Sequence, residues 1–211
     1  MPTFEQLKDR AKMTLRANYG SCVATFLIII LLIAVSFYTF IGAFLITIPL
    51  ILGLLCYFLM VFQGAQPDFS IIFTTGFTIN YGRKIGGYLW MNLWIFLWSF
   101  LFIIPGIIKA YSYAMTPYLL AAYPDIRATD ALKLSMRIMQ GHKLELFVLQ
   151  LSFIGWAILS SFTCGLLYIL YVGPYMQITL VGYYCELLNY AVRSNVIGAE
   201  ELNGAPLRYD G

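Results

Sequence analysis

Charged residues are scarce in this sequence, and their scarcity argues against an ordinary soluble fold. Only 11% of the residues are charged and 61% are hydrophobic, whereas about 25% of a typical soluble domain is charged. The net charge of +3 is small and dispersed along the chain. No basic-aromatic motif accompanies it, so we expect no nucleic-acid binding.

The sequence is also poor in histidine and has no cluster of cysteines, which argues against metal and cofactor chemistry. The chain has one histidine and four cysteines, and Cys22, Cys56 and Cys185 fall within apolar segments. A zinc site needs grouped nitrogen or sulfur ligands, and no zinc-protease, serine-hydrolase or phosphate-loop motif occurs. We therefore expect no metal, no cofactor and no enzymatic activity. A lipid-processing site built from dispersed residues is the remaining enzyme alternative.

The chain does contain a repeated pattern of paired apolar segments. Each unit has an amphipathic stretch ending at glycine, an apolar segment, a turn glycine and a second apolar segment with a proline. The three sets of marker residues are, in that order: Gly20, Gly82 and Gly141; Gly42, Gly106 and Gly165; Pro49, Pro117 and Pro174. Two of the units also share an Asn-Tyr-Gly triplet, at 18–20 and 80–82. A period of about sixty residues with paired apolar segments predicts three transmembrane hairpins.

The expected fold is therefore an all-α membrane protein, a single domain over residues 1–211. Its repeats cover roughly 1–62, 63–123 and 124–190, with a cytoplasmic tail at 191–211. The six predicted spans are Cys22–Phe40, Ala43–Phe62, Tyr88–Ile104, Ile107–Ala122, Leu144–Phe162 and Leu166–Leu188. Each is close to the 17–25 residues that a helix needs to cross the hydrocarbon core.

The distribution of charge predicts the orientation of these spans. Twelve of the thirteen basic residues lie before the first span, between hairpins or after the last span. The positive-inside rule places that side, and both termini, in the cytoplasm of a bacterial cell membrane. Only Lys109 lies near the outer side. A cleavable signal peptide ending near Ser36 is a weaker alternative, because the apolar run continues past it.

Amphipathic stretches precede the three hairpins and are predicted to be helices on the cytoplasmic surface. Their apolar faces carry Phe4, Leu7, Ala11 and Leu15; Phe69, Ile72, Phe73 and Phe77; and Ala128, Leu132, Ser135, Met136 and Met139. The glycine after each stretch suits a left-handed helix cap. We interpret these helices as interfacial anchors, the alternative being a collar that binds anionic lipid or a partner.

Polar groups within the spans are the candidate binding residues, because they are costly in lipid. Lys109 and Gln177 are the proposed polar anchors, with Tyr111, Tyr118, Tyr171 and Tyr175 as an aromatic wall. Structural alternatives remain open for both anchors. Lys109 can extend its amine to the outer surface, and Gln177 can bridge two helices. The tyrosines can equally serve as packing residues.

Several longer segments resemble a known family. They are Pro105-Gly-Ile-Ile-Lys-Ala-Tyr-Ser-Tyr-Ala-Met-Thr-Pro-Tyr118, Ala131-Leu-Lys-Leu-Ser135, Gly141-His-Lys143 and Leu151-Ser-Phe-Ile-Gly-Trp156. The chain resembles bacterial integral membrane proteins grouped as domain of unknown function 975. A weaker likeness is to the membrane region attached to some glycerophosphodiester phosphodiesterases, whose catalytic domain has no counterpart here. The resemblance implies a multi-pass membrane protein and supplies no catalytic residues.

The sequence thus favours a non-enzymatic membrane protein that binds a lipid, an amphipathic peptide or a membrane partner. Membrane lipids are the expected partners, with a membrane protein or amphipathic peptide as further candidates. The alternative is a small transporter or channel for an amphiphilic solute. Internal repeats favour transport, whereas the shortage of ionisable groups in the spans opposes a polar pathway.

Overall fold

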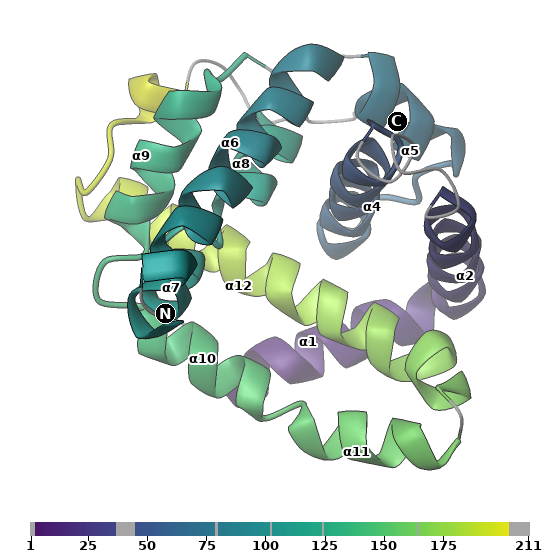
Figure 1. The fold of residues 1–211 in the computed structure, drawn as a ribbon. Helices are drawn as coiled ribbons and strands as arrows, with labels where there is room; N and C mark the ends of the chain where they lie inside the picture. Colours follow the sequence, from purple (N-terminus) through teal and green to yellow (C-terminus); the bar gives the residue numbers. More distant parts are fainter. Residues whose placement is uncertain are drawn as a thin grey trace.

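The computed structural model describes residues 3–36, 45–78, 80–101, 103–123, 125–163 and 165–202, and they contain helices and no strand (Figure 1). The all-α prediction is therefore confirmed for this part of the chain. The helices are α1 (Phe4–Ala17), α2 (Tyr19–Ser36), α4 (Thr47–Phe62), α5 (Ser70–Phe73), α6 (Tyr81–Leu101), α7 (Ile103–Ser112), α8 (Thr116–Ala122), α9 (Ala128–Ile138), α10 (Lys143–Leu151), α11 (Ile154–Phe162) and α12 (Gly173–Arg193). Two π-helical turns, η1 (Thr74–Thr78) and η2 (Tyr168–Val172), and a 3₁₀ turn, η3 (Ala199–Leu202), complete them.

Helix α1 follows the predicted amphipathic pattern. Thr3 and Gln6 form a reciprocal capping box at its first turn, which satisfies backbone N–H groups that have no partner within the helix. Leu7, Ala11 and Leu15 are buried on one face. That face packs against α12, as the purple and light-green ribbons of Figure 1 show.

The other two predicted amphipathic stretches also pack on helices of a different part of the chain. Helix α5 and the turn η1 lie against α4, and α9 lies against α8. The contact on α4 is close: a Cβ atom on Gly53 would lie 2.3 Å from the carbonyl oxygen of Ile72. The second stretch is not one regular helix, and its predicted apolar face is divided. Ile72 is fully buried, whereas Phe73 is 39% exposed.

Two of the three predicted glycine caps are wrong. Gly20 lies inside α2 and Gly82 inside α6, where each continues the helix. Asn80 takes the left-handed conformation instead, with φ of 52°, which asparagine adopts more readily than most residues. Gly141 has φ of 90°, as a left-handed residue after a helix requires.

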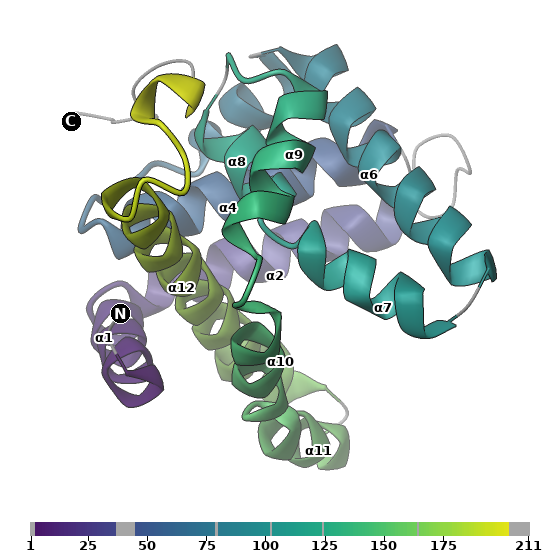
Figure 2. The same cartoon turned by 90° about the vertical axis from the view of Figure 1, so that its left-hand side faces the viewer.

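The predicted turn at Pro105-Gly106 is also wrong, because both residues lie in α7. Proline is compatible with the first turn of a helix, where its missing N–H needs no partner. Figure 2 shows α7 running back alongside α6. Gly106 allows this close packing, since a Cβ there would lie 2.2 Å from the Oγ of Ser99. Gly42 and the chain around it lie outside the described residues.

The second helices of the predicted hairpins are interrupted or begin late. Residues 113–115 form a turn between α7 and α8, and the turn η2 precedes α12. Pro49, Pro117 and Pro174 are each the second or third residue of a helix. Pro49 and Pro117 begin helices after a break in the helical pattern, whereas Pro174 follows the π-helical turn η2 inside a continuous run of helical residues, 166–193.

Within the part of the chain that the structure describes, two helical stretches are long and apolar enough to cross a membrane. They are Tyr19–Ser36, with 18 residues, and Lys143–Phe162, with 20. The second includes a short irregularity at residues 152–153 between α10 and α11. Helix α4 is apolar but has only 16 residues. These lengths support two crossing helices and do not by themselves establish the six predicted spans.

Candidate functional site

An apolar cavity lies between α2, α4, α8, α12 and the segment that joins α7 to α8. Its volume is about 330 Å³. The wall consists of Phe26, Ile29, Ile30, Ile33, Ile51, Leu54, Leu55, Ala114, Pro117, Tyr118, Gln177, Leu180 and Tyr184. Phe26 is the eighth residue of α2, so the cavity begins about 10 Å along that helix. It therefore lies beside the middle of α2 and far from its first turn.

Gln177 is the only residue with a side-chain amide among those that line this cavity. On α12, it shares a face with Leu180 and Tyr184, at helical spacings of three and seven residues. Its side chain has no hydrogen-bond partner among the described residues. The phenol of Tyr118, by contrast, lies 3.4 Å from the Sγ of Cys185. Two of the six residues predicted from the sequence, Gln177 and Tyr118, are thus brought together.

Lys109 belongs to a different place. Its ammonium nitrogen lies 5.3 Å from the ring centre of Trp98 and 5.7 Å from that of Tyr113. Such cation–π contacts stabilise by roughly 0.5–1 kcal/mol at exposed sites. Lys109 is half-buried on α7 and does not line the cavity that contains Gln177.

The remaining predicted tyrosines take part in packing between helices. The hydroxyl of Tyr111 donates to Oε1 of Gln150 at 2.8 Å, joining α7 to α10. The rings of Tyr171 and Tyr175 lie 5.8 Å apart. They also contact Trp156 at 5.7 Å and Phe153 at 5.3 Å, respectively. These tyrosines and the cavity residues do not form one aromatic wall.

Three hydroxyl groups that are not among the six predicted binding residues tie distant parts of the chain together. Tyr19 donates to the carbonyl of Leu170 at 3.1 Å, four residues before Pro174. Tyr81 donates to the carbonyl of Leu45 at 2.8 Å, four residues before Pro49. A proline leaves the carbonyl four residues earlier without its helical donor, so each tyrosine supplies the missing hydrogen bond.

The third such contact lies at the break before Pro117. The Oγ of Ser135 in α9 donates to the carbonyl of Ser112 at 2.9 Å, at the end of α7. The two tyrosines occupy equivalent positions in the repeated Asn-Tyr-Gly triplets, which is a signal that was present in the sequence. Ser135 ends the segment Ala131-Leu-Lys-Leu-Ser135 and lies on the predicted apolar face of its stretch, but neither feature indicated this hydrogen bond.

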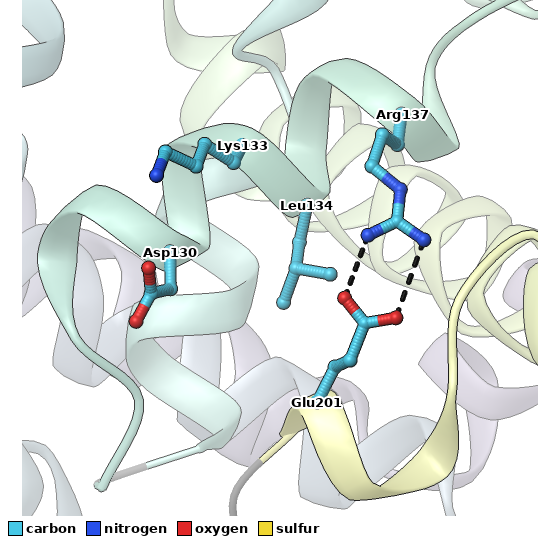
Figure 3. Close-up of a pocket in the computed structure, with 5 residues that line it drawn as sticks. All are labelled: Asp130, Lys133, Leu134, Arg137 and Glu201. Atoms are coloured by element: carbon cyan, nitrogen blue, oxygen red, sulfur yellow. Dashed lines mark hydrogen bonds and ion pairs between the residues drawn. The ribbon is translucent and has the colours of Figure 1, made fainter.

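A polar pocket of about 270 Å³ lies on the surface between α9 and η3, away from the apolar cavity. It is lined by Asp130, Lys133, Leu134, Arg137 and Glu201 (Figure 3). Arg137 holds the carboxylate of Glu201 with two nitrogens, at 2.6 and 3.2 Å. It also donates to the carbonyl of Val196 at 2.5 Å. The hydrogen bonds from Arg137, followed by that from the Gly198 amide, lower the pKa of Glu201.

Other polar groups form local contacts without making a metal site. His142 and Glu145 pair at 2.9 Å, and the described residues contain no cluster of three potential metal ligands. Lys84, predicted to lie between spans, is only 1% exposed and donates to the carbonyl of Thr75 in η1. The described residues therefore include an apolar cavity with an unpaired amide and a charged surface pocket.

Comparison with known proteins identifies the family. Residues 3–191 match the family model described as "Protein of unknown function (DUF975)". The chain belongs to this family. Neither the curated proteins nor the solved structures searched gave a match. The family description assigns no activity, and the site is therefore interpreted from its own geometry.

Proposed function

We propose that this chain is a multi-pass membrane protein that binds an amphiphile within its helical bundle. The observation that carries the proposal is the apolar cavity containing the unpaired amide of Gln177. A largely apolar pocket with one orienting polar group is typical of small-molecule binding sites. In contrast, a transporter or channel needs a polar path, and the wall of this cavity has no charged residue.

The outer surface of the bundle supports a membrane setting. Large apolar side chains face outward along α2, α6, α7, α10 and α11, and Phe100 and Phe162 are each 82% exposed. Exposed apolar surface on this scale is unusual in a soluble monomer. The charged residues of the described chain instead lie mostly on α1, on α9 and near the ends of α6, α10 and α12. With the positive-inside rule, this distribution supports cytoplasmic termini.

The packing also supports an arrangement of three hairpins. Each predicted amphipathic stretch packs on the second helix of another unit: α1 on α12, α5 on α4, and α9 on α8. Three side-chain hydrogen bonds join the units in the same cyclic order. Tyr19 of the first unit donates to the third unit, Tyr81 of the second donates to the first, and Ser135 of the third donates to the second. We infer six crossing segments from this agreement, together with the apolar outer surface.

Single-thiol labelling in intact cells tests this topology. Cys164 is kept as the sole native cysteine, and separate variants place a thiol at Ser70 or Thr129 on a background without native cysteines. A membrane-impermeant maleimide should label Cys164 and leave the other two unmodified until the cells are opened. External labelling at position 70 or 129, or no external labelling at Cys164, would contradict the six-span arrangement.

Co-purification tests the binding function in the same protein. Wild-type protein extracted in nanodiscs should retain a bound amphiphile, detected by native mass spectrometry as a discrete added mass. An Ala114→Phe variant, which fills the cavity, should lose that mass while keeping its thermal unfolding transition. Equal retention by both proteins would contradict binding in this cavity.

A further inference from the structure

The wall of the Gln177 cavity restricts the charge of its occupant. None of the residues that line it is ionisable at neutral pH, because its polar members are Tyr118, Tyr184 and Gln177. A charged group placed there would lose its hydration without gaining a counter-ion, which is costly in an apolar surrounding. The part of a ligand that enters the cavity is therefore uncharged.

The size of the cavity restricts the shape of the occupant. At about 330 Å³, it is near the lower end of the usual range of about 300–1,000 Å³ for ligand pockets. Branched aliphatic side chains from α2 and α4 form much of its surface. These features suit one unbranched hydrocarbon chain better than a two-chain lipid or a folded peptide.

Gln177 defines the polar group that such a chain should carry. An amide offers both a donor and an acceptor, and neither has a protein partner within the described part of the chain. Gln177 is half-buried, so its amide is accessible to an occupant of the cavity. A hydrogen bond there offsets the cost of an unpaired polar group in an apolar surrounding. A hydroxyl group can accept from the amide nitrogen and donate to the amide oxygen through a single atom, whereas an ester carbonyl can only accept.

We propose that this cavity binds a long-chain alcohol, with its hydrocarbon chain along α2 and α4 and its hydroxyl hydrogen-bonded to Gln177. The inference rests on the proposed membrane-embedded function and specifies its ligand class. In this proposal, Gln177 selects the polar group of the ligand, and the aliphatic wall binds the ligand's hydrocarbon chain.

Competition for photolabelling tests the proposal in nanodiscs. A hexadecane analogue carrying a diazirine is crosslinked to the full chain, and the labelled residues are identified by peptide mass spectrometry. Labels should map to the cavity wall, including α2 and α4. At equal concentration in the bilayer, hexadecanol should displace the probe about three- to thirtyfold better than hexadecane, the range expected from one hydrogen bond in a membrane protein.

Three variants separate the roles of the amide and the wall. Gln177→Leu should remove the preference for the alcohol and keep labelling by the alkane probe. Ala114→Phe should abolish cavity labelling. Asn92→Leu is the matched control, because Asn92 is an exposed amide on α6 that bonds its own helix at Tyr88. If Gln177→Leu does not fold, as judged by thermal unfolding, Gln177→Met provides the same loss of the amide with an unbranched side chain.

The outcomes distinguish the ligand proposal from the membrane proposal. Equal displacement by hexadecanol and hexadecane in the wild type, or a preference that survives loss of the amide, would overturn the alcohol assignment. Stronger displacement by hexadecyl phosphate would also overturn it. Failure of the thiol-labelling topology would instead reject the multi-pass arrangement, whatever the competition experiment shows.

Discussion

At the scale of single residues, the tyrosines of the two Asn-Tyr-Gly triplets solve a problem created by proline. Pro49 and Pro174 each deprive an earlier carbonyl of its helical hydrogen bond, and Tyr81 and Tyr19 provide replacements. In an apolar environment, the replacement matters because a carbonyl without a donor is unfavourable. The chemistry that the two triplets share therefore lies in the phenol, whereas a Cβ on the glycine of either triplet would meet no atom within 4 Å.

The Tyr81→Phe substitution should destabilise the protein by about 0.5–1.5 kcal/mol, the usual contribution of one hydrogen bond. The thermal unfolding midpoint in nanodiscs measures this effect. Tyr168→Phe is a suitable control, because the Tyr168 hydroxyl has no hydrogen bond within the described chain although its ring packs against Phe26. Equal midpoints for the two variants would show that the Tyr81 contact contributes nothing.

At the scale of elements, glycine permits close packing between helices at some positions and not at others. A Cβ on Gly53 of α4 would lie 2.3 Å from the backbone oxygen of Ile72. A Cβ on Gly86 of α6 would meet no atom within 4 Å. Close packing therefore leaves no room for a side chain at position 53, whereas position 86 has room for one.

Alanine substitutions should separate these requirements. Gly53→Ala forces α4 and α5 apart and should cost about 1–3 kcal/mol, as overpacking usually does. Gly86→Ala should instead stabilise α6 by up to about 1 kcal/mol, because alanine favours a helix more than glycine does. Thermal unfolding of both variants in the same nanodiscs provides the comparison, and destabilisation of similar size by both would contradict it.

The attachment of η3 to α9 should depend on pH. Arg137 and the Gly198 amide lower the pKa of Glu201 below its ordinary value of 4.5. A lowered carboxyl pKa stabilises the folded contact above pH 4.5, and this stabilisation is lost as the pH falls through the folded-state pKa. Hydrogen exchange of residues 196–202, corrected for the intrinsic pH dependence, should therefore show less protection in acid.

Substitution of the carboxylate distinguishes this cause from general acid unfolding. Glu201→Gln should weaken protection of the same residues already at neutral pH, while exchange in α12 stays unchanged. Glu200→Gln, which alters an exposed neighbour, should behave as the wild type. Full protection of η3 in Glu201→Gln would show that the ion pair does not hold this segment.

At the scale of the whole molecule, the sequence predicted the helical class because apolar and amphipathic periodicity is a local property. It also located Gly141, where the structure needs a left-handed residue. It misplaced the turn at Pro105-Gly106, because the same two residues are compatible with a turn and with the first turn of a helix. The decision depended on the packing of Gly106 against Ser99.

The candidate site, like the fold, was only partly predictable from the sequence. Gln177 stood out as an amide in an apolar segment, and Tyr118 as a nearby aromatic residue. Their shared cavity depends on how α2, α4 and α12 pack, which residue spacing alone does not determine. The Tyr19 contact joins residues 151 positions apart, and the Arg137–Glu201 pair joins residues 64 positions apart. No local sequence pattern specifies contacts between residues that are so far apart along the chain.

The cyclic order of the three hydroxyl contacts has a consequence for the continuity of the chain. Because the first unit bonds the third, the third the second and the second the first, the covalent connection between units is not their only link. The exposed residues Gly64 and Gln66 lie at the start of the second unit, at the kind of surface position where chains can be divided. We expect residues 1–65 and 66–211, produced as separate polypeptides in the same membrane, to assemble into a complementing pair.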